Sequence, residues 1–404
     1  MIQPVALATL PALTPEEAEH SRRVEALIRT RILDAGGWID FETFMELALY
    51  APGLGYYSAG AVKFGRAGDF VTAPEMSDLF SRCVARQCAE CLEELGGGDI
   101  LELGAGTGRM AAVVLGALAE RNALPKRYAI LEVSGDLRAR QQDQIARLPG
   151  SLRDRVTWLE RWPEEPLTGV VLANEVLDAL ACQRWAVHER EAPAHDFDVN
   201  QLGVALGSND ALVELERPAD ARVRAAVLSL VADLPQPLPD GYRSECCLRV
   251  APWVAALSEV LARGVVLLFD YGLPRAHYYH PARRDGTLRC HFKQRAHDDP
   301  FTRIGLQDIS AWVDFTRVAE AAAAARLDVR GFATQAAFLL GAGIEALLAE
   351  PAGAGAADRA RLAGEARRLL LPGEMGEVFK AIALVRDYDA PLAAFTHQDL
   401  RGSL

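Results

Sequence analysis

Three glycines at a fixed spacing follow an acidic residue in the run Glu102-Leu-Gly104-Ala-Gly106-Thr-Gly108. Ile100 to Leu103 is typical of a buried strand, and Met110 to Leu118 of a helix rich in Ala, Val and Leu. A strand, a tight glycine turn and a helix bring backbone N–H groups to the mouth of a nucleotide-sized pocket. The G-x-G-x-G spacing differs from the G-x-G-x-x-G of dinucleotide enzymes. It favours the cationic cofactor S-adenosylmethionine (SAM), with a plain structural turn as the alternative.

Polar residues also stand at the ends of two further predicted strands. The strand expected over Arg127 to Val133 ends in Glu132, and the strand expected from Gly169 ends in Asn174 and Glu175, with Asp178 close behind. A carboxylate at the end of the second strand can accept hydrogen bonds from both ribose hydroxyls of a nucleoside, and ligands bind outside the carboxyl ends of parallel strands. The second group would therefore face the reactive end of the cofactor. The alternatives are an exposed acid at a strand end and a helix N-terminus decorated with acids.

A glycine-rich stretch with aromatic residues precedes this core and carries the acids Asp69 and Glu75. Loops of this composition often hold functional residues. The equally weighted alternative is a surface Ω-loop, in which Pro74 and Glu75 begin the next helix.

The bulk composition limits the partners. The chain has 404 residues, of which 50% are hydrophobic and 24% charged, and its formal net charge is −12. Such an acidic chain is a poor candidate for non-specific nucleic-acid binding, which requires phosphate neutralisation. A small molecule or a basic peptide suits this charge better. No apolar run is long enough to span a membrane.

Cysteine and histidine clusters raise the question of a metal site. The odd number of cysteines, seven, and the lack of a secretory leader predict free thiols in a reducing cytoplasm. Cys83, Cys88 and Cys91 favour core packing over zinc because a fourth ligand is missing. Four histidines between His277 and His297 lack the spacing of a metal-binding helix, so a polar lid facing the substrate is favoured there and no metal is predicted.

The order of the predicted elements indicates an α/β fold. A helical and loop segment over residues 1–95 would cap the cofactor site, and residues 96–386 would form the main domain. Insertions are expected at about 182–245, with short antiparallel strands, and at 273–311, which is rich in loops. A fifth strand at Gly264 to Asp270 and two late strands, Leu327 to Thr334 and Val378 to Arg386, would complete the sheet. Residues 387–404 would form a C-terminal tail.

The short motifs assembled so far, together with several others in one order, resemble the MidA-like methyltransferases, which are related to a mitochondrial complex I assembly factor that methylates arginine. The resemblance runs from about residue 38 to 386. Its marks are Phe44-Met45, Ala48-Leu49-Tyr50-Ala-Pro52, Gly55-Tyr56-Tyr57, Gly68 to Glu75, Leu101 to Gly108, Leu131 to Ser134, Asn174-Glu175 with Asp178-Ala-Leu180, Asp270-Tyr-Gly272, Gly286-Thr-Leu288, His297 with Asp299-Pro300, Asp308-Ile309, Val313-Asp-Phe315, Thr334-Gln335 with Phe338-Leu339, and Met375-Gly376 with Phe379-Lys380. A proline that the family often has after Asp178-Ala-Leu180 is absent.

The resemblance implies a Rossmann-like class I SAM-methyltransferase fold with a seven-stranded, mostly parallel sheet, an N-terminal helical segment and an inserted substrate-side subdomain. It implies SAM as cofactor and a protein arginine, as on a respiratory complex I subunit, as acceptor. A homodimer is allowed. The expected catalytic residues are Glu175, Asp178 and Asn174. The expected cofactor-binding residues are Glu102, Gly104, Gly106, Gly108, Glu132, Asp69, Thr72, Pro74 and Glu75.

Two other functions remain open from the sequence. A SAM-binding assembly factor without catalysis would keep the glycine turn but would not need the acids near Glu175. A methyltransferase acting on a small molecule would need a closed lid from residues 273–311, whereas a protein acceptor would need a long open groove.

Overall fold

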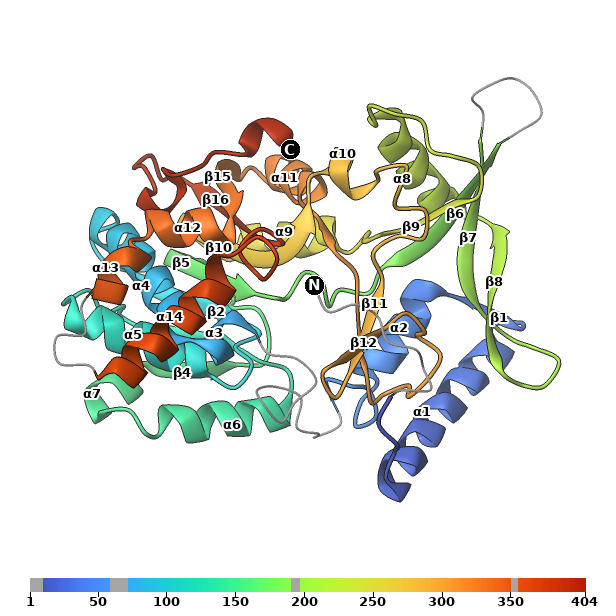
Figure 1. Ribbon diagram of the computed structural model, residues 1–404, viewed down its shortest axis with the longest axis horizontal. Coiled ribbons are helices and arrows are strands. Elements are labelled where there is room, and N and C mark those ends of the chain that lie inside the picture. Colours follow the sequence, from blue (N-terminus) through green and yellow to red (C-terminus); the bar gives the residue numbers. More distant parts are fainter. Residues whose placement is uncertain (1–9, 59–71, 190–196, 350–354) are drawn as a thin grey trace.

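The computed structural model of the chain describes residues 10–58, 72–189, 197–349 and 355–404. Two regions lie side by side in Figure 1, one around a large sheet and one around a smaller antiparallel sheet. The strands of the large sheet are β2 (Asp99–Leu103), β3 (Tyr128–Leu131), β4 (Val156–Leu159), β5 (Leu167–Asn174), β10 (Leu261–Leu273), β14 (Val313–Asp314), β15 (Asp328–Thr334) and β16 (Phe379–Arg386).

The large sheet is mostly parallel, as predicted. Seven strands follow the order β15-β16-β10-β5-β2-β3-β4, in which β16 runs antiparallel to both of its neighbours. The sheet has eight strands rather than the expected seven because the two-residue strand β14 pairs with the end of β10. Strands β2, β3, β5 and β10 therefore end at one edge, where the predicted acids stand.

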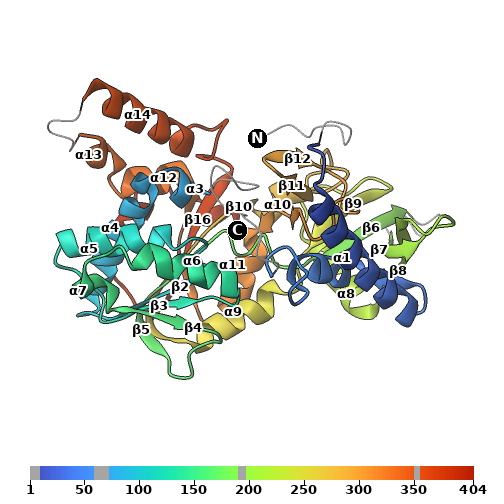
Figure 2. The same cartoon turned by 90° about the horizontal axis from the view of Figure 1, so that it is seen from below.

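Helices cover both faces of this sheet. Along β5, Val170 and Leu172 belong to one core cluster, and Val171 and Ala173 belong to the other. This alternation buries both faces, as a parallel sheet requires. The first face packs against α4 (Asp78–Glu94), α5 (Arg109–Glu120) and α12 (Gln335–Gly341), and the second against α9 (Val250–Glu259) and α11 (Phe315–Ala324). Figure 2 shows α9 on the side of the sheet away from α4 and α12.

The smaller sheet has five antiparallel strands, four from the stretch of about 182–245 where such strands were expected and one from the N-terminal segment. They are β1 (Trp38–Asp40), β6 (Gln183–Glu189), β7 (Phe197–Leu206), β8 (Leu212–Pro218) and β9 (Tyr242–Cys246). The helices of this region are α1 (Pro15–Asp34), α2 (Phe41–Tyr50), α8 (Ala221–Ala232) and α10 (Arg275–Tyr278). Helix α1 begins at a capping box made by Thr14 and Glu17, because each residue satisfies a backbone N–H of the other.

A third, three-stranded sheet lies within the stretch expected to be rich in loops. It consists of β11 (Arg289–Phe292), β12 (Arg295–His297) and β13 (Asp308–Ser310), in the order β12-β11-β13. Its register pairs His291 with Asp308 and Arg289 with Ser310. This small sheet therefore brings polar side chains of two separate segments together.

Seven further helices complete the elements of the described residues. They are α3 (Ala73–Met76), α6 (Gly135–Ile145), α7 (Gly150–Arg153), α13 (Ile344–Ala349), α14 (Ala356–Leu370) and the short 3-10 helices η2 (Ala393–Phe395) and η3 (Arg401–Ser403). The C-terminal stretch expected as a tail packs onto the large-sheet region, where the rings of Phe395 and Phe338 lie 5.4 Å apart. In the described ranges, no helix combines the length and the apolar character needed to cross a bilayer.

Candidate active site

A cavity of about 1010 Å³ lies at the edge where β2, β3 and β5 end. Residues that follow these strands line it together with Tyr50 of α2, Asp308 of β13 and the segment around residues 283–296. The region of the large sheet and the region of the smaller sheets therefore both contribute residues to the walls of the cavity. The carboxyl edge of a parallel sheet is where ligands bind in α/β proteins, and the volume suffices for a nucleoside cofactor with an acceptor group beside it.

The glycine turn after β2 forms one end of the cavity. Gly104, Gly106 and Gly108 have φ values of 62°, 54° and 84°, which L side chains rarely adopt. Gly104 and Gly106 line the cavity. Gly108 instead is the N-cap of α5, and a Cβ there would come within 3.0 Å of the Cα of Gln141. The first two glycines thus expose backbone to a ligand, whereas Gly108 serves the packing of α5 against α6.

Glu102 lies buried at the end of β2 and lines the cavity. The hydroxyl of Tyr128 donates a hydrogen bond to its Oε2 at 2.6 Å. Burial raises the pKa of Glu102 to about 7, against the lowering effect of that hydrogen bond, and the charge of Glu132 adds to the increase. A positively charged ligand group would relieve this cost because it favours the ionised carboxylate.

Glu132 follows β3 and also lines the cavity. Its Oε1 accepts a hydrogen bond from the N–H of Ser134 at 2.8 Å, and its Oε2 accepts one from Nε2 of Gln141 at 2.9 Å. The same Nε2 donates to the carbonyl of Gly106 at 3.0 Å. Gln141 therefore ties the carboxylate to the glycine turn and fixes both in one arrangement.

The segment before α4 closes another side of the cavity. Thr72, Pro74 and Glu75 line it, and the hydroxyl of Thr107 in the glycine turn donates a hydrogen bond to Glu75. The predicted cofactor-binding residue Asp69 lies outside the described residues.

The end of β5 carries two predicted catalytic residues, Asn174 and Glu175. Glu175 has a φ of 53°, a conformation that costs energy for a residue with a side chain and is found mostly at functional sites. Nδ2 of Asn174 donates to Oε1 of Glu175 at 3.1 Å, while the Oδ1 of Asn174 is buried without a hydrogen-bond partner among the described residues. Burial, and then the nearby charge of Asp178, raise the pKa of Glu175 to about 8.

Asp178 is the third predicted catalytic residue, and neighbouring strands hold it in place. Asp270 of β10 accepts hydrogen bonds from the backbone N–H groups of Leu177 and Asp178, at 2.9 and 3.2 Å. The hydroxyl of Tyr271 donates to Oδ2 of Asp178, and Oδ1 is buried without a partner in the described part of the chain. Burial raises the pKa of Asp178 to about 6, although the hydrogen bond from Tyr271 lowers it. Asp270 thus positions the turn, and Asp178 presents a free acceptor.

Three further residues of this end were not predicted as site residues. Asp308 lines the cavity and accepts a hydrogen bond from the hydroxyl of Tyr57 at 2.9 Å. The ring of Tyr57 stacks on that of Tyr50 at 5.4 Å, and Tyr50 donates to the carbonyl of Ala179 at 2.7 Å. These contacts place a carboxylate and two aromatic rings next to the Asp178 turn. The motifs carrying them were visible in the sequence, but their contact with the strand ends was not.

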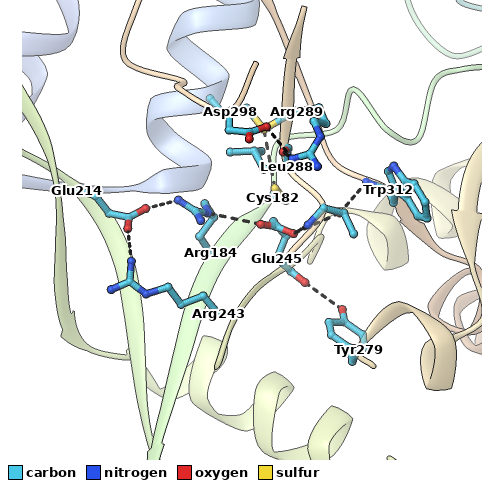
Figure 3. A network of polar contacts seen from close by, with 12 residues as sticks. Cys182, Arg184, Glu214, Arg243, Glu245, Tyr279, Leu288, Arg289, Asp298 and Trp312 are labelled. Atoms are coloured by element: carbon cyan, nitrogen blue, oxygen red, sulfur yellow. Dashed lines mark hydrogen bonds and ion pairs between the residues drawn. The ribbon is translucent and has the colours of Figure 1, made fainter. Parts of the chain in front are cut away.

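The segment before β11 forms a wall that a buried ion pair supports. Thr287 donates its N–H to Oε2 of Glu245 at 2.8 Å, and Nε of Arg184 lies 3.5 Å from Oε1 of the same carboxylate. Figure 3 shows this chain of contacts from Glu214 through Arg184 and Glu245 toward Trp312. The N–H of Trp312 donates to Oγ1 of Thr287 at 3.0 Å. Because Thr287 and Trp312 both line the cavity, the pair fixes its wall.

The cysteine and histidine clusters lie in different surroundings. Cys83, Cys88 and Cys91 are buried in the core, and burial raises the pKa of each thiol. Of the four histidines, His291 lines the cavity, and its burial lowers its pKa to about 4, so it is neutral. No group of three or more potential ligand side chains that could hold a metal occurs among the described residues.

Comparisons with known proteins agree with this geometry. A family model described as “Putative S-adenosyl-L-methionine-dependent methyltransferase” matches residues 83–333. A crystal structure of a COG1565 superfamily member from Burkholderia thailandensis, bound to S-adenosyl-homocysteine, is 41% identical with a TM-score of 0.92. The match covers 98% of this chain and 100% of that chain. The expected resemblance to a methyltransferase family is therefore confirmed, and SAM is its cofactor.

Two curated relatives are named as arginine methyltransferases. The “Protein arginine methyltransferase NDUFAF7 homolog, mitochondrial” of Drosophila melanogaster is 29% identical, over 76% of this chain and 74% of the relative. The mouse “Protein arginine methyltransferase NDUFAF7, mitochondrial” is 25% identical, over 94% of this chain and 91% of the relative. Since both are named mitochondrial, they contradict the cytoplasmic location expected from the cysteines, and that prediction is wrong. The unpaired cysteines indicate a reducing environment, but they do not distinguish one reducing compartment from another.

Proposed function

The chain belongs to the SAM-dependent methyltransferase family, and from this premise we propose that it methylates a guanidinium nitrogen of arginine in a protein substrate. Two relatives with that named activity support the acceptor. The observation that carries the proposal is a pair of buried oxygen acceptors without partners in the described chain, Oδ1 of Asn174 and Oδ1 of Asp178, beside the Glu175 carboxylate. An unsatisfied buried acceptor costs about 1–3 kcal/mol, which a ligand with several N–H donors would recover.

The cofactor end of the cavity fits SAM because it combines two carboxylates, which can accept hydrogen bonds, with two glycines that leave the backbone exposed. SAM supplies a methyl group on a positively charged sulfur. Glu132 would accept hydrogen bonds from the ribose hydroxyls, and Glu102 would face the amino-acid portion. Gly104 and Gly106 lack side chains that would fill the space beside them. Thr72, Pro74 and Glu75 would close this end.

The acceptor end matches a guanidinium. This group has five N–H donors in one plane, and carboxylates bind it through paired, charge-assisted hydrogen bonds. Asp178 and Glu175 would hold two of its edges, Asn174 would accept a further N–H, and Asp308 would add a negative charge from the second region. An enzyme contributes to methyl transfer mainly by holding the nitrogen in line with the bond between the methyl carbon and the sulfur, and by excluding water from the nitrogen.

Glu175 has the properties of the group that handles the proton. Its pKa of about 8 means that it holds a proton at neutral pH in the ligand-free site. A bound guanidinium favours the ionised form, so Glu175 would lose this proton on acceptor binding. The nitrogen that gains a methyl group must release a proton, and the carboxylate oxygen of Glu175 would accept it.

The domain division is part of the same proposal. We propose that the five-stranded sheet with α1 and α2, together with the three-stranded sheet, forms the substrate-side subdomain on a seven-strand class I core. Tyr50, Tyr57 and Asp308 come from these segments and line the cavity at the Asp178 turn. The carboxylates at that turn are the reason to prefer catalysis over an assembly role without chemistry, which would not need them.

The test combines binding with transfer. We expect Glu175→Gln to bind S-adenosyl-homocysteine with unchanged affinity and to lose at least about 100-fold in transfer, because the proton acceptor is gone. Labelled SAM is incubated with cell lysate, and mass spectrometry identifies the modified side chain. Glu259→Gln, on the exposed end of α9, is the matched control and should retain activity. Label on a side chain other than arginine, label confined to small molecules, or full transfer by Glu175→Gln would each overturn the proposal.

A further inference from the structure

Arg283 places a positive charge on the wall of a cavity whose acceptor end is acidic. We propose that Arg283 binds a carboxylate of the acceptor, so that the enzyme prefers an arginine with an acidic residue close to it in the substrate sequence. This inference rests on the proposed function and names the substrate class more narrowly.

The guanidinium of Arg283 is fixed before any ligand binds. Its Nη1 donates to the carbonyl of His277 at 2.6 Å and to that of Tyr278 at 2.8 Å. Its Cζ lies 5.3 Å from the centre of the Trp312 ring, so the two planar groups form a cation–π contact. Nε and Nη2 have no hydrogen-bond partner among the described residues. A donor group held in place in this way loses little side-chain entropy on binding.

The charge of Arg283 is not compensated by a carboxylate within ion-pair distance in the described ranges. Arg289, which also lines the cavity, differs because its Nη1 is 2.7 Å from Oδ1 of Asp298. Arg368, on α14, is exposed, and no contact in the described part of the chain holds its guanidinium. Among the cavity arginines, Arg283 therefore combines a fixed position with an open charge, which is the arrangement that recognises a carboxylate.

The position of Arg283 points to the acceptor rather than the cofactor. Its ring partner Trp312 follows Ala311, whose N–H donates to the carbonyl of Asp178 at 3.4 Å. Trp312 is also bound to Thr287, on the wall that Glu245 supports (Figure 3). Arg283 thus belongs to the wall next to the Asp178 turn, whereas Glu102 and Glu132 mark the cofactor end at β2 and β3. Because Arg283 and the Asp178 turn line the same cavity, the carboxylate should come from a residue near the target arginine.

The experiment measures peptide affinity by calorimetry with S-adenosyl-homocysteine present. The probes are capped pentapeptides with a central arginine and with Asp, Asn or Lys at each neighbouring position in turn. At one position at least, we expect the Asp peptide to bind about 10-fold more tightly than the Asn peptide, which corresponds to one charge-assisted contact. Arg283→Gln should remove this preference. Arg284→Gln, in the exposed neighbouring residue, should keep it.

The outcomes separate this inference from the function beneath it. Equal binding of Asp and Asn peptides at every position would overturn the role of Arg283 and leave arginine recognition intact. If Arg283→Gln weakened S-adenosyl-homocysteine itself, the carboxylate would be that of the cofactor, and the acceptor assignment would be wrong. Failure of all arginine peptides to bind better than matched citrulline peptides would contradict the proposed function as well.

Discussion

Glu132 owes its orientation to Ser134 and Gln141, so its carboxylate is fixed before a ligand arrives. We expect Glu132→Ala to weaken SAM binding by about 10- to 100-fold, because one or two hydrogen bonds to a charged acceptor are lost. Isothermal titration calorimetry with SAM measures this directly. The exposed Glu165→Ala is the control and should bind SAM like the parent. Unchanged affinity in Glu132→Ala would remove Glu132 from the cofactor site.

Individual site residues were predictable where one strand end sufficed to place them. Glu102 and Asn174 stand at the ends of buried strands and Glu132 directly follows one, and parallel strands bring such positions to one edge. Tyr57 and Asp308 could not be found in this way, because they are 251 positions apart, one in the turn after α2 and the other in β13. Gly108 fits the motif, but the structure uses it at the start of α5 and not in the cavity wall.

At the level of elements, long apolar runs were informative and short polar strands were not. The strands β2, β5 and β10 were expected because both faces of a central parallel strand are buried. Strand β1 has three residues, and its partner β7 lies more than 150 positions later. Strands β11 to β13 have four residues or fewer, which is too short for the alternation in β11 to be told from a loop. Their pairing depends on contacts that no local pattern records.

The wall segment before β11 offers a prediction at the same scale. Gly286 has a φ of 75°, and a Cβ there would stand 2.4 Å from both carboxylate oxygens of Glu245. Gly286→Ala should therefore displace Glu245 and the Thr287 segment that it holds. We expect the KM for the acceptor to rise about 10-fold or more, with unchanged affinity for SAM, since the cofactor end is built from β2 and β3. Steady-state kinetics and calorimetry on the same preparation separate the two.

Gly241→Ala is the matched control for this substitution. Gly241 has a φ of 69°, so an alanine there bears a similar backbone cost of about 1–2 kcal/mol, but its Cβ would meet nothing within 4 Å. Its KM should stay at the parent value. If both variants raised KM equally, backbone strain alone would explain the effect, and the supporting role of Glu245 would be lost.

At the scale of the whole molecule, the buried acids of the cavity make stability depend on pH. In the ligand-free protein the pKa of Glu175 is about 8, that of Glu102 about 7 and that of Asp178 about 6, all above their ordinary values. Between the ordinary pKa and the raised one, the folded state binds more protons than the unfolded state. These three groups then make the free energy of unfolding fall as pH rises from about 4.5 to about 8, by up to about 1.4 kcal/mol per pH unit for each. His291 has the opposite effect between about pH 4 and 6.5, because its pKa is lowered to about 4.

Denaturant unfolding of the ligand-free protein between pH 5 and 8.5 measures this slope. We expect Glu175→Gln to flatten it most between pH 6 and 8, because Glu175 has the highest of the three pKa values and its neutral replacement has no proton to lose. Glu259→Gln should reproduce the slope of the parent, since this side chain is exposed. If the parent and Glu175→Gln had the same slope between pH 6 and 8, Glu175 would be ionised in the empty cavity beside the other two carboxyls. Their cluster would then be stabilised without a cation, and a bound guanidinium would relieve no cost there.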